Sequence, residues 1–427
     1  MNDQTRTASA VHDRRGQRPQ WRSAFSALRH RNFRLLWTST LFVSGGNWVQ
    51  QVTLGWLAFH LSGSALQVSV VLGLRAIPLL LAPVAGVLAD RFDRRKVLLI
   101  DQAFLALLAL GFALVVLADL VQLWHLYLFS FLTGAGWSIN NPTRQTLVSN
   151  AVPRDSLMNA VALNSMAFNT TRIFGPAAGG FLITFFGPGV NFLLQAVFYV
   201  GVMALIIPFR AEYASRERAN REVSILHNLR EGFAHVTQER TTLTVILVAL
   251  VPTLTMMSTT MTLMPVFAVE VLGQARDEGN ELGLLLTGAG VGGFLGTLLM
   301  AMFSQVRAKG RLILAALGVG GLGIIVFSQV DTLAAAMGAL VVVQAALMVN
   351  MTTNNTVLQM ITPDWMRGRV MGVYMMDIGM MPLGGVIAGI VADSFGVQTA
   401  LWASASVGLA AVGLVAALNP GFRQLRV

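Results

Sequence analysis

Long apolar stretches alternate with short polar turns along almost the whole chain. A helix that crosses a lipid bilayer needs about 20 consecutive apolar residues, and the sequence repeats that pattern twelve times. We therefore predict an all-α membrane protein with twelve membrane-spanning helices. The predicted spans are residues 35–61, 66–89, 97–118, 120–143, 157–186, 189–209, 241–269, 282–306, 312–330, 333–361, 370–392 and 394–418.

The composition supports a membrane protein and excludes other classes. Of the 427 residues, 55% are hydrophobic and 12% are charged, whereas soluble domains average about 25% charged residues. Neither a soluble globular protein nor a disordered chain has this balance. Because Cys is absent, disulfides and zinc–thiolate sites are excluded as well.

Cationic side chains fall on one side of the predicted spans. Lys and Arg favour the cytoplasmic side of a membrane, so twelve spans with both termini inside predict where they lie. The N-terminal arm, the turns after even-numbered spans, the middle loop and the tail hold 27 of the 30 cations. Arg75 and Arg172 lie within spans, and Arg276 lies on the opposite, acidic side. The net charge of +10 therefore indicates orientation in a bacterial-type inner membrane, not nucleic-acid binding.

An internal repeat divides the chain into two halves. Residues 146–153 align with 356–363 at an offset of 210, and Gly175 and Gly180 align with Gly384 and Gly389 at an offset of 209. Two six-span halves related in this way place a shared cavity at the bilayer midplane, which opens alternately to each side. The repeat therefore indicates transport.

The repeat also predicts the domain organisation. We expect six-helix bundles at 35–209 and 241–418, joined by a linker at 210–240 that contains an amphipathic helix. Residues 1–34 form a basic cytoplasmic arm, either an interfacial helix or a flexible segment, and residues 419–427 form a tail. The arm contains no apolar core of the kind that a secretory signal needs.

The turn between the second and third predicted spans carries a charged motif. Residues 86–98 read GVLADRFDRRKVL and resemble the signature loop of the major facilitator superfamily, although Asp93 stands where the family has a second Gly. The resemblance implies a conformational latch, in which Asp90 meets the positive N-terminus of a helix of the other half, near Arg369. A cluster that only sets orientation is the alternative. The latch residues are Gly86, Asp90, Arg91, Arg94 and Arg95.

The fifth predicted span carries a second motif, Gly175-Pro176-Ala177-Ala178-Gly179-Gly180. It resembles the signature of proton-driven drug antiporters in the same superfamily. Pro176 removes a backbone hydrogen bond and the glycines allow close helix contact, so we expect a kinked interface that seals between the halves. Ordinary helix packing is the alternative.

A third resemblance narrows the branch of the superfamily. Residues 141–145, 152–154 and 157–160 are similar to the enterobactin and macrolide exporters. The chain also departs from the drug antiporters, which carry an Arg in span four at the position of Ser130. We therefore do not assign the role of that Arg in proton coupling to position 130.

Four ionisable side chains lie within predicted spans: Arg75, Asp101, Arg172 and Asp377. Placing a charged side chain at the centre of a membrane helix costs about 2.5–3.5 kcal/mol on insertion scales. We therefore expect each of the four to have a structural or functional role. We expect Asp101 to join the polar network of the basic loop. In the superfamily's arrangement, span two meets span eleven and span five meets span eight. Arg75 or Arg172 is then expected to stabilise Asp377 as an anion in one conformation and to release it for protonation in the other. A permanent ion pair, an Arg bound to carbonyls and an Arg that holds a transported anion are the alternatives.

Amides and methionines are candidates for the wall of the cavity. Buried amides need partners that a wet cavity supplies, and flexible thioethers suit a pocket that accepts varied apolar shapes. Hydrogen bonds between helices and ordinary packing are the alternatives. The candidates are Asn47, Gln50, Gln51, Asn140, Asn164, Asn169, Met257, Met261, Asn350, Asn354 and Met376.

These patterns predict a secondary transporter and no enzyme. Two GxGxxG stretches, at 288–293 and 318–323, lie inside spans rather than after a strand, and no P-loop or metal-binding His spacing occurs, so we expect no cofactor or metal. The predicted function is proton-coupled efflux of amphipathic, drug- or siderophore-like small molecules by alternating access in a monomer. An importer or facilitator of a small organic anion, and a non-transporting membrane receptor or flippase-like protein, are the alternatives.

Overall fold

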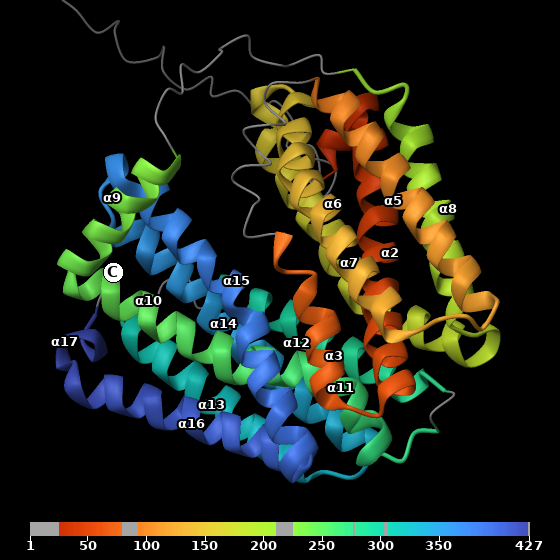
Figure 1. Cartoon of the computed structure of the whole chain (residues 1–427). Helices are drawn as coiled ribbons and strands as arrows, with labels where there is room; N and C mark the ends of the chain where they lie inside the picture. Colours follow the sequence, from red (N-terminus) through yellow and green to blue (C-terminus); the bar gives the residue numbers. More distant parts are fainter. Residues whose placement is uncertain (1–24, 79–92, 211–224, 276–277, 303–305, 426–427) are drawn as a thin grey trace, which may run out of the picture.

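The first half of the chain forms a bundle of helices that stand side by side (Figure 1). The computed structural model describes residues 25–78, 93–210, 225–275, 278–302 and 306–425. The first-half helices are η1 (Ser26–Arg29), α2 (Arg31–Ser62), α3 (Ala65–Leu74), α5 (Arg94–Leu117), α6 (Leu123–Asn150), η3 (Arg154–Ser156), α7 (Leu157–Phe186) and α8 (Pro188–Ile206).

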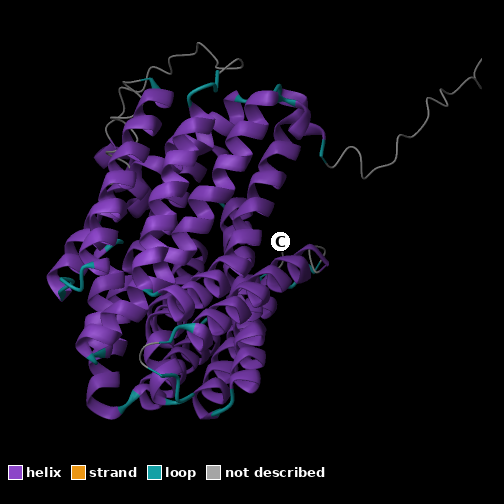
Figure 2. Cartoon of the chain, turned by 90° about the vertical axis from the view of Figure 1, so that its right-hand side faces the viewer, coloured by secondary structure: helices purple, strands orange, loops and turns teal. Residues whose placement is uncertain are grey.

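The second half forms another helical bundle, which is tilted against the first (Figure 1). The view turned by 90° shows the described residues as helices and loops (Figure 2). Its helices are α9 (Ile225–Gln238), α10 (Arg240–Pro252), η4 (Thr253–Met257), α11 (Ser258–Glu270), α12 (Asn280–Met302), α13 (Lys309–Gln329), α14 (Leu333–Ile361), α15 (Asp364–Phe395), α16 (Val397–Leu418) and α17 (Pro420–Arg423). The part of the chain that the structure describes contains no strand. Each predicted span contains a described helix, although the second span is described only as far as residue 78. The all-α membrane fold is confirmed, and the count of twelve spans is consistent with the described residues.

The apolar pattern predicted the positions of the helices better than their ends. Helices α7 and α14 have the predicted bounds, whereas α6 runs on to Asn150 and α15 already begins at Asp364. These extensions are polar, because a helix can continue in water beyond the apolar slab that hydropathy detects. Within the described residues, eight helical segments are long and apolar enough to cross a membrane. Helices α2, α6 and α7 are as long but richer in polar side chains, and the predicted continuation of α3 lies outside the described residues.

The seventh predicted span is not one regular helix. Helix α10 ends at Pro252, residues Thr253–Met257 form a π-helical turn, and α11 begins at Ser258. Pro252 has no N–H to donate to the preceding turn, and the wider π turn accommodates the missing bond. The break places the hydroxyl of Thr253 opposite α15.

The two bundles meet mainly along two pairs of helices: α3 packs against α15, and α7 packs against α12. This confirms the contacts of span two with eleven and of span five with eight. Glycines make the approach possible, since a methyl group at Gly180 would lie 2.4 Å from the carbonyl oxygen of Gly279, and one at Gly389 would lie 2.4 Å from Ser69 Oγ. Such short distances mean that backbone lies against backbone or side chain with no room for a Cβ.

Among the described residues, the contacts between α7 and α12 extend from the acidic end of α7 to Arg172 near its middle. We call the end that carries the arginine-rich turns the cationic face and the opposite end the acidic face. Gly180, Ile183 and Gly279 lie in the half toward the acidic face, and they form the contact between α7 and α12. At the other end of α7, Met158 is 85% exposed. Among the described residues, the bundles are closed on each other at the acidic face, and their helices diverge toward the cationic face (Figure 1). We call the α3–α15 and α7–α12 contacts the acidic-face seam.

Candidate functional site

Asp377 lies near the middle of α15 and has one hydrogen-bond partner among the described residues. Thr253 donates its hydroxyl to Oδ2 of Asp377 at 2.8 Å. The other carboxylate oxygen, Oδ1, is buried and has no hydrogen-bond partner in the described part of the chain. A carboxylate with an open acceptor position in an apolar wall can take up a proton or receive a donor from a ligand.

Two cavities share Asp377 as part of their walls. The large cavity, of about 530 Å³, lies between α3, α10 and α15, with Phe233 of α9 at its cationic end. The small cavity, of about 120 Å³, lies between η4, α14 and α15. Among the predicted wall residues, Met376 lines the large cavity, and Met257 and Asn350 line the small one.

The large cavity is almost wholly apolar. Leu74, Ile246, Val373 and Met380 are among its walls, and Asp377 is the one ionisable residue among its described lining residues. Ligand pockets of about 300–1,000 Å³ with few polar groups hold drug-sized molecules. The lining suits an amphipathic molecule whose polar part reaches the carboxylate.

Arg75 belongs to the first bundle and makes no ion pair with Asp377. Its guanidinium donates to Asn47 Oδ1 and lies over the Trp137 ring, with Cζ 5.9 Å from the ring centroid. In this arrangement Arg75 is therefore held by an amide and an indole. The predicted pairing of Arg75 with Asp377 is absent from the described contacts.

Arg172 lies at the contact between α7 and α12. Its Cζ is 5.9 Å from the centroid of the Trp48 ring, and a methyl group at Gly293 would come within 3.0 Å of that Cζ. Among the described residues, no acceptor takes a hydrogen bond from Arg172, although a guanidinium carries five N–H donors. Gly290 and Gly293, from one of the GxGxxG stretches, serve here to admit Arg172 and its backbone.

A buried polar network occupies the cationic half of the first bundle. Asp101 accepts from Gln102 at 3.1 Å and from Asn140 at 2.8 Å. Arg144 donates to Ser39 Oγ at 2.6 Å and to Asn140 Oδ1 at 3.3 Å. The network that contains Asp101 thus runs to Asn140 and Arg144 across α5 and α6.

Arg144 corrects one sequence interpretation. Its place near the end of span four predicted a cation in a cytoplasmic turn, but the side chain is only 2% exposed. The internal repeat contains the signal for this burial, because Asn140 and Arg144 align with Asn350 and Asn354 at the offset of 210. Asn354 donates to Asn350 Oδ1 at 3.1 Å, so both halves bury a polar i, i+4 pair at the same place.

The remaining predicted amides mostly bond between or within helices. Gln195 of α8 donates to Gln50 at 2.5 Å, and Thr40 donates to Asn164 at 3.1 Å. Asn169 donates to a carbonyl one turn earlier in its own helix, at 3.0 Å. Gln51 and Met261 are half-buried. Gln50, Asn140 and Asn164 therefore form hydrogen bonds between helices, which is the alternative to a place in the cavity wall.

The predicted latch falls partly outside the described residues. Gly86, Asp90 and Arg91 lie there, whereas Arg94 is the first residue of α5. Asp93, the departure from the family's Gly, accepts from the N–H groups of Arg95 at 2.9 Å and Lys96 at 3.3 Å. Asp93 is therefore the N-cap of α5, which explains an acid at that position. Arg95 donates to the backbone carbonyls of Ile206 and Ile207 at the end of α8.

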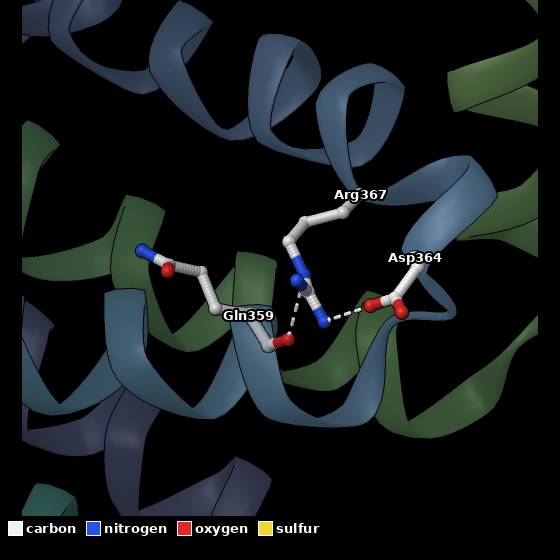
Figure 3. Close-up of polar contacts among 3 residues, drawn as sticks. All are labelled: Gln359, Asp364 and Arg367. Atoms are coloured by element: carbon white, nitrogen blue, oxygen red, sulfur yellow. Dashed lines mark hydrogen bonds and ion pairs between the residues drawn. The ribbon is translucent and has the colours of Figure 1, made fainter. Parts of the chain in front are cut away.

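The N-terminal end of α15, where the latch is expected to dock, is held from two sides. Figure 3 shows Arg367, which donates to the carbonyl of Gln359 at 3.1 Å and pairs with Asp364 at 2.5 Å. Arg369 pairs with Glu231 of α9 at 2.7 Å. These contacts fix the corner between α14 and α15 and fasten the linker helix to the second bundle.

The span-five motif packs α7 against two neighbours. Methyl groups at Gly175 and Gly179 would lie 2.7 Å from Trp48 Cβ and 3.2 Å from Val49 Cα, both in α2. Gly180 instead faces Gly279 and Gly283, at the start of α12. The glycines around Pro176 therefore bring α7 into contact with both its own bundle and the opposite one.

Comparison with known proteins agrees with this architecture. The sequence profile of the family described as "transmembrane secretion effector" matches residues 22–422. The multidrug efflux pump Tap of Mycolicibacterium fortuitum is 27% identical over 401 residues, which cover 92% of this chain and 96% of Tap. The staphyloferrin A transporter of Staphylococcus aureus is 26% identical, over 84% of this chain and 89% of that protein. The enterobactin exporter EntS of Citrobacter koseri is 26% identical, over 86% and 84%.

Solved structures of transporters share the fold. The nucleoside transporter NupG superimposes with a TM-score of 0.73 at 14% identity, over 92% of this chain and 98% of NupG. A bacterial homologue of the iron transporter ferroportin gives a TM-score of 0.71 at 16% identity, over 92% and 98%. At this identity the likeness establishes the arrangement of helices and nothing about substrate.

Proposed function

The chain belongs to the transmembrane secretion effector family of the major facilitator superfamily, and on this premise we propose that it exports amphipathic small molecules in exchange for protons. It is an integral membrane transporter, and its relatives include a multidrug efflux pump and siderophore exporters. We place it in the inner membrane of a bacterial cell as a monomer, with the cationic face in the cytoplasm.

The observation that carries the proposal is the position of Asp377. Its carboxylate lies in the wall of both cavities, at the side of α15 that faces η4, and its Oδ1 has no described partner. A group placed there contacts a molecule in the large apolar cavity and also lies beside the seam between the bundles. Proton binding and substrate binding can therefore compete for one oxygen atom.

The proposed cycle uses this competition. With the cationic face open, Asp377 gives its proton to the cytoplasm and the substrate binds in the large cavity. When the bundles rock, the site opens to the exterior, where a proton displaces the substrate. Each turn exchanges substrate for proton, and the inward proton gradient drives export.

Arg172 favours a second candidate, the transport of a small organic anion. Its guanidinium has no described acceptor and lies beside Trp48 at the contact between the bundles. A carboxylate or catecholate would supply the missing acceptor, and the indole would pack on an aromatic ring. In this scheme a siderophore-like anion binds to Arg172, whereas a cationic drug binds to Asp377.

We further propose that Asp90 and its neighbours form the latch of the outward-open state, and that the Gly175–Gly180 motif seals the seam. The motif glycines line the contact that must open.

Transport in inside-out vesicles tests the function. We expect vesicles with an acidified lumen to accumulate ethidium or enterobactin when they contain the parent chain. Asp377→Asn is expected to abolish accumulation against a gradient and to retain downhill exchange, while Asp331→Asn, an exposed acid on the acidic face, behaves like the parent. Uphill pumping by Asp377→Asn would show that the proton is carried elsewhere. Binding without accumulation by the parent would indicate a receptor.

A further inference from the structure

The last turn of α15 crosses the seam and caps a helix of the other bundle. Asp393 Oδ2 accepts a hydrogen bond from the Ser64 hydroxyl at 2.5 Å and from the N–H of Leu66 at 3.3 Å. Asp393 Oδ1 accepts from the N–H of Ala65 at 2.6 Å. One carboxylate thus receives three donors from the start of α3, although the two residues are more than 300 positions apart in sequence.

The chemistry of this contact is that of an anion at a helix N-terminus. The first N–H groups of a helix have no partner within it and carry partial positive charge. Ser64 already provides a cap from within the chain, because its hydroxyl accepts from the N–H of Gln67 at 3.3 Å. The carboxylate of Asp393 is therefore an additional cap, supplied from the opposite bundle to the groups that Ser64 leaves unpaired.

The other side of the seam has the same device at the repeat-equivalent position. Thr184 precedes Asp393 by the same 209 positions that separate Gly180 from Gly389. Thr184 Oγ1 accepts from the N–H of Gly279, just before α12, at 2.9 Å. In each half, the last turn of the glycine-rich helix caps the first turn of a helix in the opposite half.

A third contact across the seam, after those of Asp393 and Thr184, supports this closure. Trp56 of α2 donates its indole N–H to the carbonyl of Glu278 at 2.5 Å. All three contacts lie at the acidic face, and each joins one bundle to the other. They exist only while the two bundles are closed there, because hydrogen bonds are lost within about 1 Å of extra separation.

We infer that Asp393, with Thr184 as its weaker counterpart, is an outer lock that stabilises the conformation closed at the acidic face. This inference rests on the proposed alternating access and adds to it the residues that must release in each cycle. Asp393 provides the larger share, because its bonds are charge-assisted and Thr184 offers a neutral hydroxyl.

Distance measurements between the bundles test the lock. The chain has no Cys, so Leu120→Cys and Thr332→Cys introduce two unique labelling sites on exposed acidic-face loops, one in each bundle. Nitroxide labels on the full-length chain in lipid nanodiscs report the distance across the acidic face by double electron–electron resonance. Asp393→Asn is expected to raise the ratio of open to closed populations about fivefold, Asp393→Ala about tenfold, and Thr184→Val about twofold.

A neighbouring residue provides the control. Ser394 lies in the same turn, and within the described part of the chain its hydroxyl bonds only to the carbonyl of Ile390 in its own helix, at 2.8 Å. Ser394→Ala is therefore expected to keep the parent distribution. Identical distributions in Asp393→Asn and Ser394→Ala would overturn the inference. If Asp393→Asn elutes as aggregate, Thr184→Val decides the question in the same way, because it removes the bond from Gly279 across the seam and, among the described residues, otherwise only a bond to Gly180 within α7.

The lock and the proposed function fail separately. If the parent chain transports nothing but its label distance still responds to Asp393→Asn, the proposed export is refuted. The lock is then supported in a protein with two conformations. If the parent transports normally but substitutions at residues 393 and 184 leave the label distances unchanged, the proposed export is supported and the lock is refuted.

Discussion

The contact of Gly180 with α12 gives the sharpest steric prediction. In the closed seam, a methyl group at Gly180 would lie 2.4 Å from the carbonyl oxygen of Gly279 and 2.9 Å from Gly283 Cα. Ordinary contacts of a Cβ are 3.4–4 Å, so α7 and α12 must separate by about 1 Å to accept alanine. Overpacking of this kind costs about 1–3 kcal/mol. The cost falls only on the closed conformation, so Gly180→Ala is expected to raise the ratio of open to closed populations by at least about fivefold.

The label pair at positions 120 and 332 measures this ratio. Gly413→Ala is the matched control, because nothing lies within 4 Å of a methyl group there and both substitutions replace a helical Gly. Each variant gains the same helix propensity, about 1 kcal/mol, so this gain cancels between them. The difference between the two variants therefore isolates the steric effect at the seam.

A null result would refute the reasoning. If Gly180→Ala and Gly413→Ala elute normally, unfold at the same temperature and give the same distance distribution, the seam is not tightly packed in the membrane. The interpretation of the Gly175–Gly180 motif as a seal would then fail as well.

The other predictions concern Arg144 and Arg172. Arg144→Gln removes charge-assisted bonds to Ser39 and Asn140 and is expected to lower the free energy of unfolding by about 3 kcal/mol, measured by thermal unfolding in detergent against the exposed Arg154→Gln. An unchanged unfolding temperature would contradict the network. Gly293→Ala places a methyl group 3.0 Å from the Arg172 guanidinium, which must shift. We expect the transport of enterobactin to fall and that of ethidium to stay unchanged, and equal losses for both would exclude Arg172 as an anion site.

The fold was predictable because a bilayer restricts the chain so strongly. Every backbone group in lipid must bond within its own helix, so apolar length alone located the helices. The repeat then paired the halves, since Gly180 and Gly389 both lie at contacts between bundles. Hydropathy does not register a helix that continues into water, which is why α15 begins six residues before the predicted start at 370.

The candidate site was predictable only in part. A charge inside a span drew attention to Asp377, and the structure places it on two cavities. Sequence spacing carries no information about which side of a helix faces a neighbour in another bundle. Arg75 bonds to Asn47 in this conformation, so the expected pairing of Arg75 or Arg172 with Asp377 in one conformation stays a prediction. Arg144 and Asp393 lie near span ends, where cations and acids usually reflect topology, and their roles emerge from contacts with Ser39 and Ala65.

The two faces of the molecule use the α3–α15 pair in opposite ways. The helices run antiparallel, and at the acidic face the end of α15 lies beside the start of α3. At the acidic face Asp393 caps α3, and at the cationic face Arg369, near the start of α15, pairs with Glu231 of the linker helix. We propose that the latch motif of Asp90 docks at the start of α15 when the cationic face closes, where Glu231 pairs with Arg369. Asp90 must then either bind the helix N-terminus alone or displace Glu231, and displacement would loosen the linker helix whenever the transporter faces outward.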